Sequence, residues 1–219
     1  MAVVEELLAW QSLLRLTAVA EKSRERGFAV EVLESKDAAA ARILTLAADA
    51  QSIGFGGSLT VAALNVIEAL RAQGKELLIH GNPALSKEEK LAVMRRQLTC
   101  DLFLASVNAL ASDGTIVNID GNGNRVAAMT FGPKQTVLVV GHNKLVEGGV
   151  YEALKRIATV AAPVNAHRLG CKTPCAVTGR CADCAGRNPG SICRITSVIR
   201  QCPSCSNIRI LLVNDDLGL

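Results

Sequence analysis

The stretch 108-NALASDGTIVNIDGNGNRVAAMTFGPKQTVLVVGHNKLV-146 is the most informative part of the chain. It places a polar, glycine-rich segment, Asp120–Asn124, between two apolar runs, Thr115–Ile119 and Thr136–Val140. Glycine and asparagine tolerate positive φ angles and are typical of turns. We therefore predict a loop at the ends of two buried strands. In open α/β sheets, ligand sites collect at such loops.

Two local structures fit the polar segment. Asn122-Gly123 is a favoured pair for a type I′ turn, which would make a β-hairpin. The apolar run Val126–Met129 followed by Gly132-Pro133 indicates instead a short helix, capped by Asn124, because glycine and proline end helices. The Gly-Pro pair favours the helix over a returning strand.

Apolar runs without alternation recur along the chain, as expected for strands buried on both faces. They are Leu77–Ile79, Leu102–Ala105 and Val137–Val140. Helical segments separate them, and one opens with a capping box at Ser86–Glu89. Strands that alternate with helices predict an α/β fold with a mostly parallel sheet and helices on both faces.

Helical spacing gives further expectations. Residues 3–26 should form a packing or dimerisation helix, and Asp37 should cap a second helix after a strand at Phe28–Leu33. The one-sided apolar positions are Val3, Leu7, Trp10, Leu14 and Ala18 in the first helix, and Leu91, Met94 and Leu98 in the helix after Ser86.

The segment Ser52–Thr60 has the pattern of a short strand, a Gly-rich turn and the start of a helix that runs to about Gln73. Backbone N–H groups in such a turn bind anions, and glycine lets a ligand approach the backbone. A tight β-to-α connection without a ligand is the other interpretation. The turn lacks the Gly-Lys-Ser/Thr ending of a Walker A loop and is not a full G-x-G-x-x-G, so nothing indicates a nicotinamide or flavin cofactor.

Seven of the eight cysteines lie between residues 171 and 205. In a reducing cytosol, clustered thiolates usually hold zinc or an iron–sulfur cluster. Two C-x2-C pairs, Cys181/Cys184 and Cys202/Cys205, allow both sulfurs of a tight turn to face one metal. Few apolar residues surround them, so a metal would supply ordering energy. Free thiols, or a redox pair at Cys202/Cys205, are the alternatives. The isolated Cys100 is expected to be a small buried hydrophobe.

The composition limits the other function classes. A net charge of +4 with 3% aromatic residues does not indicate nucleic-acid binding. No apolar run approaches the roughly 18 residues of a membrane span. Glu5 and Glu6 stand where a signal peptide carries positive charge. We expect a cytoplasmic protein of 219 residues that forms one domain.

Several blocks resemble the LUD-domain family, the lactate utilisation proteins of the LutC/YkgG type. The likeness extends over roughly residues 10 to 219, which include Gly54–Thr60 and the Cys-rich segment. The family is similar in fold to the NagB/RpiA/CoA-transferase-like superfamily, in which the turn that corresponds to Gly56–Thr60 often holds phosphate or carboxylate. The blocks are Asn108–Leu110, Asp113-Gly114, Val117–Gly121, Gly123–Ala128, Phe131–Lys134, Gly141-x-Asn143-Lys144 and Ala162-Pro163-x-Asn165-x-x-Arg168.

The resemblance implies a single LUD domain over residues 1–219. An N-terminal helix would occupy residues 1–26, and a metal-binding segment at residues 171–205 would precede the last strand. The family pattern implies Cys175, Cys181, Cys184 and Cys193 as ligands of a [4Fe–4S] cluster or Zn²⁺. Cys171, Cys202 and Cys205 depart from that pattern.

Three functions compete. The first is a LUD-type protein that carries an iron–sulfur cluster or zinc and acts in the oxidation or utilisation of lactate or a similar small hydroxy acid, as an enzyme component or as a partner of other lactate-oxidation subunits. The second is a stand-alone enzyme of the isomerase/CoA-transferase-like fold that acts on a small anionic substrate. The third is a non-catalytic metal-binding protein, and a homo-oligomer is compatible with all three. The expected catalytic residues are Asp120 and Lys144, and the expected substrate-binding residues are Gly56, Gly57, Ser58, Thr60, Asn118, Asn124 and Arg125.

Overall fold

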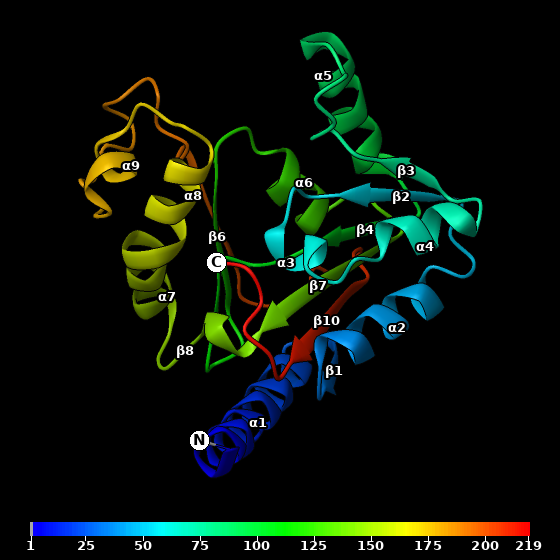
Figure 1. Ribbon diagram of the computed structural model, residues 1–219, viewed down its shortest axis with the longest axis vertical. Coiled ribbons are helices and arrows are strands. Elements are labelled where there is room, and N and C mark those ends of the chain that lie inside the picture. Colours follow the sequence, from blue (N-terminus) through cyan, green and yellow to red (C-terminus); the bar gives the residue numbers. More distant parts are fainter. Residues whose placement is uncertain (1) are drawn as a thin grey trace.

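A six-stranded parallel sheet forms the centre of the fold (Figure 1). The structure is a computed structural model that describes residues 2–219. Every pair of neighbouring strands is parallel, so all six carboxyl ends lie at one edge of the sheet. The predicted α/β class is confirmed. In spatial order the strands are β1 (Ala29–Leu33), β10 (Ile208–Val213), β7 (Gln135–Gly141), β4 (Leu102–Ala105), β2 (Ser52–Phe55) and β3 (Glu76–Leu78).

Both faces of this sheet are covered, as the unbroken apolar runs predict. Leu102 and Leu104 of β4 point to one face, and Phe103 and Ala105 point to the other. The first face packs against α2 (Lys36–Leu46), α3 (Leu59–Ala62) and α4 (Ile67–Ala72). The second face packs against α1 (Ala2–Glu25), the 3₁₀ turn η1 (Gln97–Thr99), α6 (Asn124–Thr130) and a second sheet.

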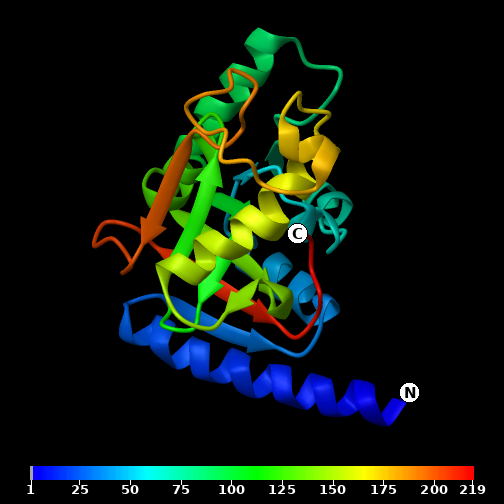
Figure 2. The ribbon, with the colours of Figure 1, turned by 90° about the vertical axis from the view of Figure 1, so that its left-hand side faces the viewer.

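The second sheet is a feature that the apolar pattern did not predict. It contains four strands and pairs β6 with β5 and β9 in antiparallel fashion (Figure 2). The predicted strand Thr115–Ile119 therefore exists as β6, but it lies outside the central sheet, because the turn at Asp113-Gly114 folds it back on β5. In spatial order the strands are β8 (Leu145–Val146), β5 (Ala109–Ala111), β6 (Ile116–Asp120) and β9 (Ile195–Ile199).

A long interrupted helix covers the outer face of the second sheet (Figure 1). It begins as α7 (Val150–Arg156), passes through the π-helical turn η3 (Ile157–Ala161) and ends as α8 (Ala162–Arg168). The short 3₁₀ turn η2 (His142–Lys144) follows β7, and α9 (Pro174–Thr178) opens the Cys-rich segment. A π-helical turn inside a helix often marks a functional site.

The helix predicted after the polar loop is present as α6, so the hairpin interpretation is wrong. Its N-cap is Gly123 and not Asn124, which is the first helical residue. Ser35 caps α2 in place of Asp37, because the Ser35 hydroxyl accepts from the Ala38 amide at 3.2 Å. The capping box at Ser86 is confirmed at the start of α5 (Lys87–Arg96).

Two predicted apolar helix faces turn outward. In α1, Leu16, Val19 and Ala20 contact the core, and the predicted positions from Val3 to Leu14 are exposed. The first half of α1 carries apolar side chains on all its sides, so the spacing of apolar residues alone did not identify its buried side. α5 projects away from the sheet with no buried residue (Figure 1). Leu91, which was expected in the core, is exposed. Among the expected core positions after Ser86, only Leu98 is packed against the core, and it lies beyond the end of the helix.

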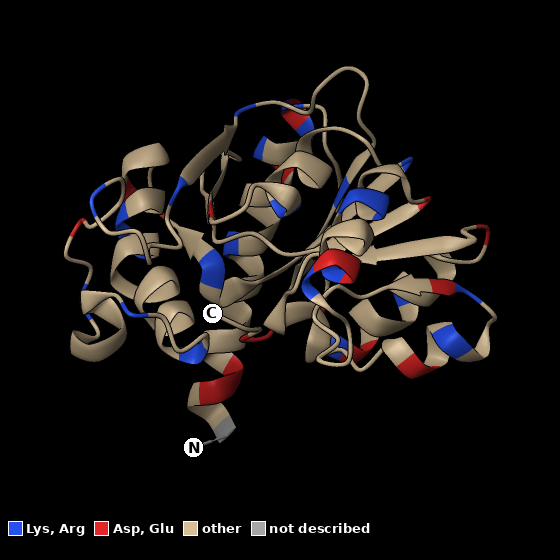
Figure 3. Ribbon diagram, turned by 90° about the horizontal axis from the view of Figure 1, so that it is seen from above, with Lys and Arg blue, Asp and Glu red and all other residues tan. Residues whose placement is uncertain are grey.

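Charged residues are interspersed over the elements of the fold (Figure 3). No helix among residues 2–219 is long and apolar enough to cross a membrane.

Replacing Gly132 by alanine should lower the free energy of unfolding by about 3 kcal/mol, so the variant should unfold at a lower denaturant concentration. Gly132 has φ +131°, and an added Cβ would overlap the Leu98 carbonyl oxygen. Gly74→Ala is the matched control, because its φ is +74° with nothing within 4 Å of the added Cβ. The control should cost only about 1 kcal/mol in urea unfolding. Equal losses would contradict the tight contact at Gly132.

Candidate functional site

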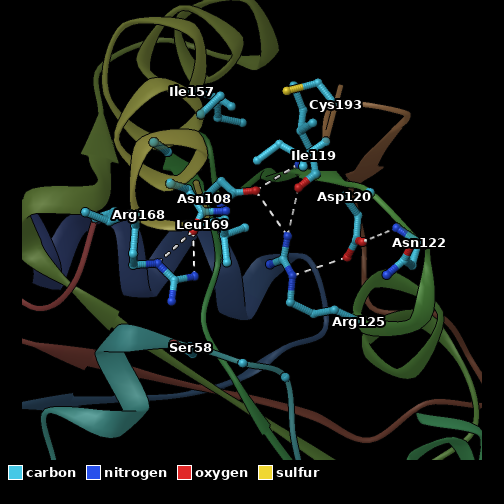
Figure 4. A pocket seen from close by; sticks show the side chains of 18 of the residues that line it. Ser58, Asn108, Ile119, Asp120, Asn122, Arg125, Ile157, Arg168, Leu169 and Cys193 are labelled. Atoms are coloured by element: carbon cyan, nitrogen blue, oxygen red, sulfur yellow. Dashed lines mark hydrogen bonds and ion pairs between the residues drawn. The ribbon is translucent and has the colours of Figure 1, made fainter. Parts of the chain in front are cut away.

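A cavity of about 670 Å³ opens at the carboxyl edge of the parallel sheet (Figure 4). The ends of four strands reach it, through the Gly56–Thr60 turn after β2, His80 after β3, Ser106 after β4 and Lys144 after β7. The helix α7–η3–α8 and residues 189–194 close the other side. This is where an open parallel sheet is expected to bind a ligand.

Lys144 is a buried cation in the cavity wall. Only 4% of the residue is exposed, and its Nζ lies 2.7 Å from Thr60 Oγ1 and 2.9 Å from Ser106 Oγ. Among residues 2–219 no carboxylate forms a salt bridge with it. Burial lowers its pKa to about 7, and the positive charges of Arg156 and Arg125 contribute to the shift. The site therefore holds an ammonium group whose charge the protein leaves without an acidic partner.

The turn that carries Lys144 is fixed by its neighbours. Asn143 Oδ1 accepts from the Leu217 amide at 3.1 Å, which ties η2 to the segment after β10. The guanidinium of Arg156 on α7 donates to the Asn143 carbonyl at 2.9 and 3.1 Å. Thr60 donates its own hydroxyl hydrogen to Leu217 O at 3.0 Å, so its oxygen is left to accept from Lys144. The amine is thus held in one position.

Arg125 connects the polar loop to the neighbouring strands. Its guanidinium donates to side chains and carbonyls of the surrounding strands, and its Nε lies 3.3 Å from Asp120 Oδ2 (Figure 4). Burial lowers the pKa of Arg125, and the charge of Asp120 opposes that shift. All its N–H groups have partners inside the protein, so its role is to position the loop. The other acceptors are Ser106 O, Asn118 Oδ1, Asn108 Oδ1 and Ile119 O.

Asp120 anchors the loop between β6 and α6. Its Oδ1 accepts from the amides of Asn122 and Gly123, both at 3.1 Å, and its Oδ2 pairs with Arg125. These contacts give Asp120 an anchoring role at the start of α6, in addition to the catalytic role that the sequence predicts.

Asp120→Asn should therefore lower stability by about 1 kcal/mol, because the turn acceptor is kept and the ion pair is lost. Asp120→Ala removes both and should cost about 3 kcal/mol. Urea unfolding of the two variants measures the difference. If both variants were as stable as the parent, the anchoring role would be wrong.

The turn at Gly56–Thr60 packs closely against this loop. A Cβ on Gly56 would stand 3.2 Å from Arg125 Cγ, so glycine allows the close approach. Gly57 has φ +69°, which favours glycine. Ser58 caps α3 through the Val61 amide at 3.3 Å. α3 spans only four residues, so any ligand contact here would come from backbone N–H groups of the turn and owe little to a helix dipole.

The cavity brings together most of the predicted site residues. Of the predicted catalytic and substrate-binding residues, only Asn118 and Asn124 do not line it, and of the predicted metal ligands only Cys193 does. Asn118 is fully buried and accepts from the Asn108 amide at 3.0 Å, and Asn124 begins α6. The predicted residues that line the cavity are Gly56, Gly57, Ser58, Thr60, Asp120, Arg125 and Lys144.

Sequence reasoning missed other lining residues. Position in the fold could have identified His80 and Ser106, because both follow buried strands of the parallel sheet. Asn165 and Arg168 stand in the block after Pro163, but nothing local relates that block to the Gly-rich turn. Arg194 reaches the cavity through the non-local pairing of β9 with β6.

The cationic side chains of the wall outnumber the acidic ones. Arg168 and Arg194 bond to neutral oxygens, such as Asn165 Oδ1 at 2.6 Å and Pro189 O at 2.7 Å. Asp120 is the acidic side chain, and Arg125 takes up its charge. The wall therefore favours an anionic ligand.

The seven C-terminal cysteines divide into two groups. Cys202 and Cys205 follow β9, and the Cys202 amide bonds to Arg26 O at 2.9 Å beside the end of α1. The five residues of β9 span about 16 Å, so this pair lies well away from the rest. The proposed metal-binding segment at residues 171–205 is therefore split by a strand. The other group contains Cys171, Cys175, Cys181, Cys184 and Cys193.

Cys193 is central to the five-cysteine group and also lines the cavity. Burial raises the pKa of its thiol to about 11, and negative charge on the four other thiols adds to the shift. The Cys181 sulfur accepts from the Asp183 amide at 3.4 Å, which suits a thiolate in a C-x2-C turn. Sulfur is the donor that zinc and iron–sulfur clusters prefer.

The geometry is not that of a closed metal site. Within residues 2–219, no three His, Cys, Asp or Glu side chains converge on one point where a metal could bind. The donor chemistry of the five cysteines fits a metal, but their side chains as they stand do not enclose one.

The fold and the cavity define an α/β protein with a cavity, whose charged side chains are mainly cationic, at the carboxyl edge of a parallel sheet. The LUD domain profile matches residues 16–213, and the chain belongs to the LUD domain family. The fold is similar to the crystal structure of a DUF162 family protein from Deinococcus radiodurans, with a TM-score of 0.53 and 14% identity over 92% of this chain and 98% of that one. No curated protein matches the sequence.

Proposed function

We propose that the cavity binds a small carboxylate of the class of lactate and similar hydroxy acids, and that the protein acts in the oxidation or utilisation of this compound. The observation that carries this proposal is the Lys144 ammonium, which is buried at the cavity without an acidic partner. Burying a charge without a counter-charge is costly, and a bound anion would supply one. Membership of the LUD domain family supports the class of substrate.

Ser106 gives the anion a hydrogen-bond donor. Its oxygen accepts from Lys144 at 2.9 Å, and its own hydrogen has only the Val107 carbonyl at 3.5 Å. A ligand oxygen in the cavity would therefore receive the Ser106 hydrogen and experience the charge of Lys144. The neutral fraction of Lys144 near pH 7 also makes the amine a base that can exchange a proton with the ligand.

We further propose that the five-cysteine group binds one zinc ion or one [4Fe–4S] cluster, with Cys175, Cys181, Cys184 and Cys193 as ligands. Five sulfur donors within one short segment support a bound metal, because sulfur is the donor that zinc and iron–sulfur clusters prefer. Zinc would supply a Lewis acid, and a cluster would supply an electron acceptor. Because Cys193 lines the cavity, either group would border the ligand.

A larger anionic substrate is the second candidate. A cavity of about 670 Å³ is in the range of pockets for drug-sized ligands, whereas lactate has only a few heavy atoms. This favours a stand-alone enzyme that acts on a larger carboxylate or phosphate ester.

Calorimetric titration at pH 6.5 separates these proposals. L-lactate is compared with lactamide, its uncharged analogue, and then with citrate and a sugar phosphate. Selective binding of lactate over lactamide supports the first candidate, and much tighter binding of the larger anions supports the second. Equal binding of lactate and lactamide, or no binding of any anion, would overturn the anion site. The visible spectrum and metal content of anaerobically purified protein decide between a cluster and zinc.

A further inference from the structure

His80 faces the glycine turn across the cavity. It follows β3, is half-buried and lines the cavity together with Gly57 and Ser58. A Cβ on Gly57 would stand 3.6 Å from the His80 Nε2 atom. Among the hydrogen bonds of residues 2–219, the backbone N–H groups of Gly57 and Ser58 have no acceptor. Three polar hydrogens can therefore converge where the imidazole meets the turn.

Gln97 determines which imidazole nitrogen carries the hydrogen. Its side chain is buried, and its Nε2 donates to the carbonyls of Phe55 at 2.9 Å and Leu78 at 2.8 Å. Two carbonyl acceptors identify this atom as the nitrogen of the amide. The same Nε2 lies 3.0 Å from His80 Nδ1. A hydrogen on Nδ1 would point at an NH₂ group, whereas a lone pair on Nδ1 can share one of the two amide hydrogens, so we expect Nε2 to carry the imidazole hydrogen.

The surroundings also keep the imidazole neutral. An imidazolium would have a hydrogen on both nitrogens, and one would meet the Gln97 amide nitrogen. Burial lowers the pKa of His80, and this effect outweighs two opposing ones, the hydrogen bond with Gln97 and the negative charge of Asp120. Arg125 pairs with Asp120 and so weakens the effect of that charge.

We propose that His80 and the Gly57–Ser58 turn form a subsite for one oxygen of the anionic ligand, with the neutral imidazole donating Nε2–H. This inference rests on the proposed anion-binding function and names the group that selects the ligand oxygen. A neutral donor stabilises a carboxylate, phosphate or enolate oxygen without giving up its proton. Gln97 does not touch the ligand and is a positioning residue.

The ligand-free protein provides the first test. The chain has three histidines, and nitrogen-15 spectra distinguish the two neutral tautomers and the imidazolium. His80→Gln identifies the His80 signals by their loss. We expect a neutral imidazole with hydrogen on Nε2 at pH 7 and pH 8. A hydrogen on Nδ1, or an imidazolium at pH 7, would overturn the proposal.

Ligand binding provides the second test, with pyruvate and inorganic phosphate as probes at pH 6.5. His80→Phe should weaken the tighter probe at least tenfold, and His80→Gln, which keeps an N–H donor, should recover most of the loss. His167→Phe is the matched control, because His167 is exposed and bonds to Ala176 O. Unchanged binding in His80→Phe would overturn the subsite alone. Failure of both probes to bind the parent protein would overturn the anion site and the subsite with it.

Discussion

Lys144→Met should weaken the binding of a small carboxylate by about a hundredfold at pH 6.5 while leaving the protein folded. Methionine keeps the length and apolar stem of the side chain, and it removes the charge that the cavity offers to an anion. Removing a buried charge beside a bound anion typically costs several kcal/mol. Calorimetry with the tighter-binding carboxylate measures the change.

The same variant should change how stability depends on pH. The pKa of Lys144 is about 7 in the folded protein and 10.5 ordinarily. Between these values the unfolded chain binds more protons, so this lysine makes the folded state more stable as pH rises. From pH 7 to pH 9 the parent should gain about 2 kcal/mol relative to Lys144→Met. Urea unfolding at pH 7, 8 and 9 measures this gain.

Lys155→Met is the control for both measurements, because it removes an exposed lysine from α7. It should bind the carboxylate as the parent does and show the same pH dependence of stability. A constant stability difference between the parent and Lys144→Met would show that Lys144 titrates normally. Parent-like binding in Lys144→Met would remove the residue from the anion site.

Cys181→Ser should abolish metal binding, and Cys205→Ser should leave it unchanged. Both cysteines are exposed and both belong to a C-x2-C pair, so the two variants differ mainly in location. Cys181 lies in the five-cysteine group around Cys193, and Cys205 lies beyond β9. One zinc ion or one cluster needs four ligands, so the loss of one thiolate should release it.

Metal content per chain, measured after anaerobic purification, decides the outcome. Cys100→Ala is a second control, because Cys100 is buried beside β4 and burial raises its pKa to about 11. It should keep its metal and lose only packing energy. Loss of metal in Cys205→Ser with retention in Cys181→Ser would assign the site to the second pair.

The central sheet could be predicted because its strands are marked locally. β4 and β7 are unbroken apolar runs, and only a strand buried on both faces needs that composition. The start of α5 was equally clear, since Ser86 and Glu89 satisfy each other's backbone amides. The second sheet had no such mark, because β5 and β8 are three and two residues long and are defined by pairings distant in sequence.

The site was only partly predictable for a related reason. Gly56 and Asp120 could be predicted because their residue types are typical of turns at ligand sites. The importance of Lys144 depends on its burial and on its having no salt bridge with a carboxylate of residues 2–219, and neither is a property of its local sequence. The tautomer of His80 depends on Gln97, which is 17 residues away. Residue types thus indicated which loops form the site, and tertiary contacts determine the protonation of the side chains within it.

β9 is one of the two edge strands of the second sheet, and it belongs to the same segment as the cysteines. It pairs with β6 from Ile116 to Asp120, and the Arg194 amide extends the pairing to the Asp120 carbonyl at 3.0 Å. If this segment detached, β6 would become an open edge of apolar sequence, which is a template for pairing with other chains. If the proposed metal holds this segment in place, a strong chelator should release the segment and cause aggregation. The cysteine segment would then protect the edge of β6 from pairing with other chains.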